Sequence, residues 1–307
     1  MAPSPFNYRL ASKGLKEPQR EALAAYIFIF PTLLGFLVFT IGPIFAAFFL
    51  SFTSYDLMSP PIFSGIQNYT RMLADPRLRI IVPNTVFLTI FAVTGNNVTG
   101  FLMAVLINRK LPAALRYFFR TAFFFPVLIA LVYCSIIWMF MFQKDTGLIN
   151  YYLGLIGISP LHWLGNQYLV KPAVIILDIW KNCGFCMLVY LAGLQGISND
   201  YYEAAAIDGA NRWQILQRIT LPLISPTMFF LVVVNMIGAL QMFDSVQVLT
   251  RGGPGDASRT AVMYIYHEAF QNFRMGYASA VALSLFVVIL GLTLLQFRVS
   301  RSWVHTD

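Results

Sequence analysis

Residues 200–222 read DYYEAAAIDGANRWQILQRITLP, the one sizeable amphipathic segment in an otherwise apolar chain. Asp200 is placed to cap a helix start, with Glu203 three positions later to reach back to its backbone amide. Three alanines follow, which favour a helix and add little bulk. Gly209 is expected to end this helix, because glycine takes the left-handed conformation without steric cost.

The second half of the same segment predicts a second short helix. Asn211 is a good N-cap, and Pro222 is expected to stop the helix because it lacks a backbone N–H and clashes with the preceding turn. Arg212 and Arg218 are expected to be exposed, beside an apolar stripe formed by Ile215, Leu216 and Ile219. We therefore expect a helix–turn–helix that lies flat at a membrane surface and presses its tip into a partner.

The composition is that of an integral membrane protein. Of the 307 residues, 58% are hydrophobic and 11% are charged, with a mean hydropathy of +0.68, whereas soluble domains carry about 25% charged residues. The net charge of +8 does not indicate nucleic acid as a partner, because the basic residues are scattered at the ends of apolar runs. Anchoring of those ends at a lipid membrane explains them.

Six apolar runs are long enough to cross a bilayer, which takes about 20 residues. The expected spans are residues 22–52, 83–108, 115–142, 172–195, 226–249 and 277–299. The fold class is therefore all-α, a polytopic membrane protein with six transmembrane helices. Residues 1–21 are expected to form a cytoplasmic N-terminal tail, and residues 22–307 a transmembrane domain that includes the amphipathic segment 199–222.

Basic residues predict the orientation of the chain. Twelve of the 21 Lys and Arg residues fall on the side of both termini and segment 199–222, eight fall on the other side, and Lys181 lies within a span. Because Lys and Arg are enriched in cytoplasmic loops, both termini are predicted to be cytoplasmic.

Two of the expected spans carry polar residues at helical spacing. An ionisable side chain at the bilayer centre costs on the order of 3 kcal/mol, so its presence calls for a partner or a function. The face on the fourth span consists of Asp178, Lys181, Asn182 and Phe185, and the face on the fifth span consists of Asn235, Gly238, Ala239 and Met242. Polar groups beside an aromatic ring suit a sugar, whose hydroxyls need donors and acceptors. The alternative is that Asp178 and Lys181 neutralise each other while the amides join helices.

The sequence predicts no catalytic and no metal site. Cys183 and Cys186 have the spacing of a redox or metal pair, but they lie mid-membrane without a second pair or flanking histidines. His267-Glu268 lacks the second histidine of a zinc-protease helix. No phosphate-binding loop is present, so the chain is expected to bind no ATP and no other cofactor itself, and not to be an enzyme.

Segment 199–222 resembles the cytoplasmic coupling motif of ABC importer permeases, Glu-Ala-Ala, three residues, Gly and a later Leu-Pro, with every marked position present. Residues 249–255, Leu-Thr-Arg-Gly-Gly-Pro-Gly, resemble the Leu-Thr-x-Gly-Gly-Pro signature of the first of two paired permeases in carbohydrate importers of the maltose-permease type. The resemblance implies a type I ABC importer permease. The ATPase-coupling residues that it implies are Glu203, Ala204, Ala205, Asp208, Gly209, Ala210 and Pro222.

The resemblance further implies partners and a location. With a second homologous permease subunit, the chain would form half of a sugar pathway across the bacterial plasma (inner) membrane. Two cytoplasmic ABC ATPase subunits would bind ATP and Mg²⁺, and an extracytoplasmic solute-binding protein would deliver the sugar. In the maltose permease the sugar contacts fall at the eight positions of the two polar faces. Here several of those positions hold an acid, a base or small residues in place of amides or aromatics.

Two alternatives stay open on the sequence. The same fold could import an anionic or non-sugar solute, such as a sugar acid, a sulfonated sugar, a glycerol phosphodiester or a polyol, and Lys181 could pair with an anionic group. An ion-coupled secondary carrier that works alone is the second alternative. It leaves residues 200–222 without a role.

Overall fold

The computed structural model describes residues 17–109 and 111–304, and these described residues divide into two compact units between Phe49 and Leu50. The tail predicted for residues 1–21 falls mostly outside the described residues. In the first unit, α1 (Glu17–Phe36) continues through a π-helical turn, η1 (Leu37–Ile41), into α2 (Gly42–Ser51). The stretch Ala24–Ser51 is long and apolar enough to cross a membrane.

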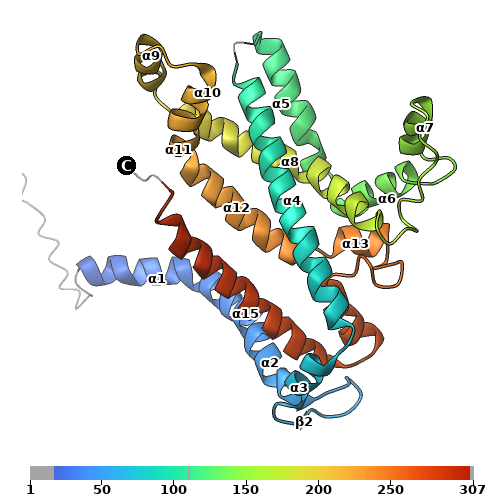
Figure 1. The fold of residues 1–307 in the computed structure, drawn as a ribbon. Helices are drawn as coiled ribbons and strands as arrows, with labels where there is room; N and C mark the ends of the chain where they lie inside the picture. The colour runs from blue at the N-terminus through green and yellow to red at the C-terminus, as the bar shows by residue number, and fades with distance from the viewer. Residues whose placement is uncertain (1–16, 110, 305–307) are drawn as a thin grey trace, which may run out of the picture. The chain divides into compact units, whose positions relative to one another are not determined.

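The second unit is almost entirely helical (Figure 1). It opens with an antiparallel pair of short strands, β1 (Thr53–Ser54) and β2 (Ile62–Phe63). The helices of its first half are α3 (Gln67–Ala74), α4 (Leu78–Ile107), α5 (Ala113–Leu128), α6 (Leu131–Met141), α7 (Leu148–Leu155) and α8 (Val170–Gly196). The helices of its second half are α9 (Asn199–Ile207), α10 (Arg212–Ile215), η2 (Leu216–Thr220), α11 (Leu221–Leu223), α12 (Ser225–Leu240), α13 (Asp244–Leu249), α14 (Ala261–Tyr266), η3 (His267–Gln271) and α15 (Met275–Ser300).

The long helices α4 and α8 pack closely because glycines let their backbones approach. A Cβ added at Gly100 would lie 2.4 Å from the Cβ of Cys186. On the other face of α8, a Cβ at Gly184 would lie 2.0 Å from the carbonyl oxygen of Phe123 in α5. Such close contacts between small residues are typical of helix packing in membranes. Residues 172–195, predicted as the fourth span, form one continuous helix within α8.

Two of the six predicted spans are not continuous helices. In the span predicted for residues 115–142, α5 and α6 meet at 101°, because Ile129 and Ala130 are extended. In the span predicted for residues 226–249, α12 ends at Leu240 and three residues separate it from α13. At this break the Thr260 hydroxyl donates to the Met242 carbonyl at 2.7 Å.

A third bend, of 64°, separates α10–α11 from α12. Within the described residues, four helices are long and apolar enough to cross a membrane, or up to six if each bent pair is one span. In Figure 1, α9 and α10 lie beyond the C-terminal end of α8, whereas α6 and α13 lie near its N-terminal end. The amphipathic segment and the broken end of α12 are therefore at opposite ends of α8.

Candidate functional site

The N-cap of α9, the first helix of the amphipathic segment, lies two residues earlier than the sequence predicted. Its N-cap is Ser198, whose Oγ accepts a hydrogen bond from the Asp200 backbone N–H at 3.3 Å. The prediction that Asp200 is the cap is therefore wrong. Asp200 lies in the first turn instead, where a carboxylate is stabilised by the positive end of the helix dipole.

The end of α9 forms a Schellman motif, which confirms the predicted role of Gly209. This residue has a φ of +75°, the left-handed conformation that glycine adopts without strain. Its N–H donates to the Ala206 carbonyl at 3.1 Å, and the Ala210 N–H donates to the Ala205 carbonyl at 2.9 Å. These two bonds satisfy the last carbonyls of the helix and turn the chain sharply.

The second helix starts where the sequence predicted. The Asn211 side chain accepts hydrogen bonds from the N–H groups of Trp213 and Gln214. In turn, the Asn211 N–H donates to the Gln214 Oε1 at 2.8 Å. The prediction that Pro222 stops this helix is wrong. A π-helical turn, η2, precedes Pro222, and the chain continues through the short helix α11 to Leu223 before it bends.

The exposed tip of segment 199–222 combines small, acidic and large apolar side chains. Most of the coupling residues implied by the resemblance are exposed there, and Ala205 is buried beneath them. Ile207 is 86% exposed and Trp213 is 63% exposed. The predicted stripe of Ile215, Leu216 and Ile219 is half-buried, with Arg212 and Arg218 exposed. We call this tip the coupling surface; large apolar side chains open to water are typical of a docking surface.

The two polar faces predicted from the sequence meet at one membrane cavity of about 350 Å³. Seven of the eight predicted residues line it: Asp178, Asn182, Phe185, Asn235, Gly238, Ala239 and Met242. Six of them come together because α8 and α12 are regular helices over these residues, so the helical spacing holds, and Met242 follows in the break after α12. A cavity of this size, with amides, a carboxylate and an aromatic ring, has the chemistry of a polar-ligand site.

Asp178 is the acidic centre of this membrane cavity. Its two carboxylate oxygens accept hydrogen bonds from the Asn96 amide of α4, at 2.8 Å, and from the Asn182 amide of α8, at 3.1 Å. No ion pair joins Asp178 to Lys181 among the residues that the structure describes. The two residues therefore do not neutralise each other.

Lys181 does not line the cavity and is only 8% exposed. Its Nζ donates to the carbonyl oxygen of Val127 at 2.7 Å, next to the last residue of α5. A basic side chain at a helix C-terminus satisfies a free carbonyl and complements the negative end of the helix dipole. The geometry gives Lys181 a structural position at the bend between α5 and α6.

Comparison with known proteins places the chain in a family. Residues 96–305 match the family described as binding-protein-dependent transport system inner membrane component. The chain belongs to this family. It is therefore a permease subunit of a binding-protein-dependent ABC importer, as the coupling motif predicted.

Relatives of the permease match it over nearly their whole length. The probable ABC transporter permease protein YesP of Bacillus subtilis is 36% identical, over 97% of this chain and 96% of the relative. The trehalose/maltose transport system permease protein MalF of Thermococcus litoralis is 33% identical, over 92% and 95%. A bacterial alginate ABC transporter, solved in complex with an alginate pentasaccharide-bound periplasmic protein, has a chain similar in structure, with a TM-score of 0.84, 26% identity and coverage of 95% and 98%.

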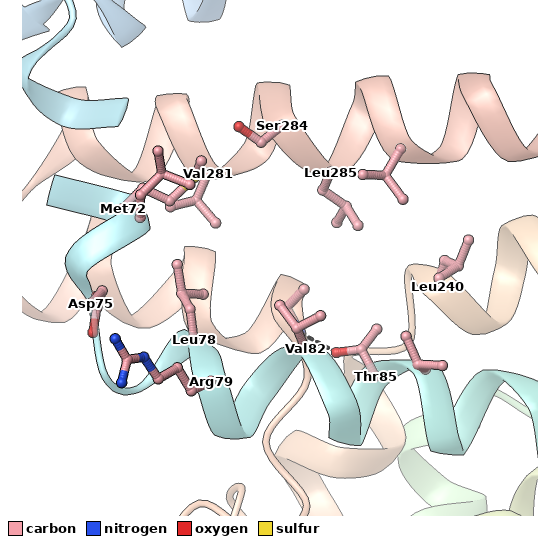
Figure 2. A pocket seen from close by; sticks show the side chains of 14 residues that line it. Met72, Asp75, Leu78, Arg79, Val82, Thr85, Leu240, Val281, Ser284 and Leu285 are labelled. Atoms are coloured by element: carbon pink, nitrogen blue, oxygen red, sulfur yellow. Dashed lines mark hydrogen bonds between the residues drawn. The ribbon is translucent and has the colours of Figure 1, made fainter. Parts of the chain in front are cut away.

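A second cavity in the permease, of about 360 Å³, is a poor candidate for a polar solute. It lies between α4 and α15, where Leu78 and Val82 face Val281 and Leu285 across the crevice (Figure 2). Apolar side chains make up most of its lining. Sugar hydroxyls would lose their water there without gaining partners.

The carboxylate at one end of this crevice, that of Asp75, already has hydrogen-bond partners within the chain. The Asp75 carboxylate accepts hydrogen bonds from the hydroxyls of Tyr264 and Tyr277, the latter at 2.6 Å. Partial burial raises the pKa of Asp75, but these hydrogen bonds outweigh it and hold the pKa below its usual range. Asp75 therefore joins the start of α4 to α14 and α15 as a structural link.

Several residues of the membrane cavity were not predicted as site residues. They are Asn96, Val127, Leu131, Val234, Gln241, Phe243, Asp244 and Ser245. A polar side chain inside an apolar span was the available signal for Asn96. Phe243 and Ser245 carried no such signal, because the break between α12 and α13 that turns them toward the cavity is not visible in the sequence.

Proposed function

We propose that this permease imports a saccharide, with the membrane cavity as its half of the translocation path. The observation that carries the proposal is the convergence of Asp178, Asn182 and Asn235 on one cavity beside the ring of Phe185. Carboxylate and amide groups offer donors and acceptors to hydroxyls, and a sugar face stacks on an aromatic ring. The names of the Thermococcus trehalose/maltose relative and of the alginate transporter support the same substrate class.

A second homologous permease subunit would complete the cavity. Gly238 and Val234 of α12 line it and are exposed on this chain alone. A partner helix placed against them would close the path and hold the solute between two subunits. The solute would arrive from an extracytoplasmic solute-binding protein.

Transport would be driven through the coupling surface. Its exposed apolar side chains, Ile207 and Trp213, flank the acidic Glu203 and Asp208, a combination suited to a cleft on a cytoplasmic ATPase subunit. Two such subunits would bind ATP and Mg²⁺, so this chain would neither hydrolyse ATP nor hold a cofactor. This role places segment 199–222 and both termini on the cytoplasmic side.

The test is uptake by the complete importer in proteoliposomes, with its partner permease, ATPase and binding protein. We expect uptake of a labelled saccharide that requires both ATP and the binding protein. Glu203→Lys at the coupling surface should lower uptake and co-purification of the ATPase together. Asp145→Lys, an exposed acid in the loop between α6 and α7, makes the same charge change away from that surface and should leave both unchanged.

The alternative of an ion-coupled carrier makes the opposite prediction. Solute uptake by this chain alone, driven by an ion gradient without any ATPase, would contradict the proposal. An acidic saccharide as the solute stays a second candidate, because the related importer transports the acidic polysaccharide alginate. Sugar acids and sulfonated sugars therefore belong in the uptake panel beside neutral sugars, a glycerol phosphodiester and a polyol.

A further inference from the structure

A second polar pocket, of about 390 Å³, lies in the second unit where the loop 250–260 packs against α13, α14 and η3. We call it the arginine pocket. It is lined by Gln247, Arg251, Arg259, Met263, Tyr266, His267 and Gln271. Its volume is within the range of roughly 300–1,000 Å³ that small-molecule sites occupy. The pocket contains no residue of the membrane cavity.

The loop that carries the two arginines is held rigidly. Arg251 has a φ of +52°, a conformation uncommon for a residue with a side chain, and its N–H donates to the Val246 carbonyl at 2.9 Å. The hydroxyls of Thr250 and Ser258 lie 2.8 Å apart and close the loop on itself, and Ser258 is fully buried. The position of the Arg251 backbone is therefore set before any ligand binds.

Positive charge in the arginine pocket exceeds the negative charge available to it. The Asp256 carboxylate lies 3.0 Å from the Arg259 Nε, but it also faces the Arg77 Nε at 3.7 Å. The Glu268 carboxylate faces Arg77 at 3.6 Å and Arg274 at 3.4 Å. Two carboxylates thus serve three guanidinium groups, and neither is paired with Arg251 among the described residues. The Arg259 side chain is 12% exposed, and its buried Nη1 has no hydrogen-bond partner within residues 17–109 and 111–304. This nitrogen has almost no accessible surface, so it adds positive charge behind the pocket wall rather than a donor that a ligand can reach.

His267 adds a donor to the same pocket. Its Nδ1 lies 3.3 Å from the Asn272 amide nitrogen, which also donates to the Glu268 carboxylate at 2.7 Å. Because that bond fixes the amide orientation, Nδ1 is the acceptor and the ring proton lies on Nε2. Burial lowers the pKa of His267, and Arg259 and Arg77 lower it further, so the ring is neutral at neutral pH.

The arginine pocket is next to the membrane cavity. The ring of Tyr266 lines the pocket and the ring of Phe243 lines the cavity, and their centroids are 5.1 Å apart. The short helix α13 also contributes to both, through Gln247 and Asp244. Only an aromatic pair and one helix turn separate the two spaces.

We propose that the arginine pocket binds the carboxylate or sulfonate group of a small acidic solute, through Arg251, Arg259 and His267. Guanidinium groups recognise such planar or multi-oxygen anions in charge-assisted hydrogen bonds. The support for anion binding comes from the residues of the arginine pocket alone. Its placement on the extracytoplasmic side, before the membrane cavity, rests on the function proposed above.

The experiment measures anion binding by the assembled importer in nanodiscs, without ATP and without the binding protein. Sulfate is titrated calorimetrically, and galacturonate and galactose then compete with it. Arg251→Gln is the test variant, because Arg251 is exposed and its removal leaves Asp256 paired. Arg79→Gln is the matched control, an exposed arginine outside the pocket.

We expect Arg251→Gln to weaken sulfate binding about tenfold, the effect of losing one charged partner, and Arg79→Gln to bind as the parent does. Galacturonate should compete and galactose should not. The proposal is overturned if the parent binds no sulfate, if Arg251→Gln binds it equally well, or if galacturonate fails to compete. Because no transport is measured, these outcomes are independent of whether the importer moves a saccharide.

Discussion

The Nζ of Lys181 lies 2.7 Å from the carbonyl oxygen of Val127, one residue before the end of α5. The two residues are 54 positions apart, on helices that pack against each other. The chain turns by 101° just after Val127, so the last carbonyls of α5 lose their helical partners. Lys181 thus supplies, from α8, a donor that the bend itself lacks.

The first prediction concerns this contact. Lys181→Met should free the end of α5 and lower the free energy of local opening there by about 1–3 kcal/mol, the penalty of an unsatisfied buried carbonyl. Hydrogen exchange of residues 127–131 should become faster, while the KM of solute uptake stays near that of the parent. Lys181→Arg keeps a donor and should restore protection. A raised KM with unchanged exchange would instead make Lys181 a solute contact.

The same contact explains why the bend could not be predicted. Residues 121–142 are uncharged throughout, and the side chain that meets the last turn of α5 comes from a residue 54 positions away. At the break after Leu240, Met242 is likewise bonded to Thr260, 18 residues further on. Sequence patterns report local preferences, and neither of these contacts is local.

Two features of the coupling surface with a local cause were predicted correctly, although the Asp200 cap and the stop at Pro222 were not. Gly209 and Asn211 act through their own backbone conformation and side-chain caps, which depend on neighbours within a few residues. The two polar faces were also predicted, since helical spacing fixes which residues of α8 and α12 share a side. Lys181 fits that spacing but is long enough to reach α5 instead, so periodicity alone did not give its position.

A second prediction tests the turn of the coupling surface. Gly209→Ala places a side chain in the left-handed conformation, which costs about 1–2 kcal/mol, and should loosen the turn after α9. Solute-stimulated ATP hydrolysis by the importer should fall, while the amount of inserted permease stays unchanged. Gly196→Ala is the control, because that glycine has open space and an ordinary helical φ. Normal stimulation in Gly209→Ala would show that the turn geometry is not needed for coupling.

A third prediction tests the membrane cavity. Asp178→Ala removes the acceptor shared by Asn96 and Asn182 and should raise the KM for saccharide uptake by about tenfold or more, as for loss of a hydrogen bond to a charged group. Co-purification with the partner subunits should not change. Asp145→Ala, which removes an exposed carboxylate outside the cavity, serves as the control. An unchanged KM in Asp178→Ala would contradict the proposal that the transported solute passes through the membrane cavity.

A fourth prediction follows from the pKa of His267. Burial, Arg259 and Arg77 lower this pKa, and Glu268 and Asp256 oppose them, so the free pocket holds a neutral ring near pH 7. A bound anion favours the protonated ring and raises its pKa. Sulfate affinity should therefore increase as pH falls through the bound-state pKa and level off below the free-state pKa. Titrations between about pH 8 and pH 5 span the range in which histidine changes charge, and His267→Gln should flatten the dependence.

The last prediction concerns the packing that holds the cavity walls in place. Gly184 allows α8 to approach α5 so closely that an added Cβ would lie 2.0 Å from the Phe123 carbonyl oxygen, a backbone atom that cannot rotate away. Gly184→Ala should therefore force the helices apart at a cost of about 1–3 kcal/mol, and lower the melting temperature of the purified complex. Gly291→Ala, in α15 with open space around it, should melt as the parent does. Equal melting of both variants would mean that α5 moves freely against α8, and that the bend capped by Lys181 is not a fixed wall of the cavity.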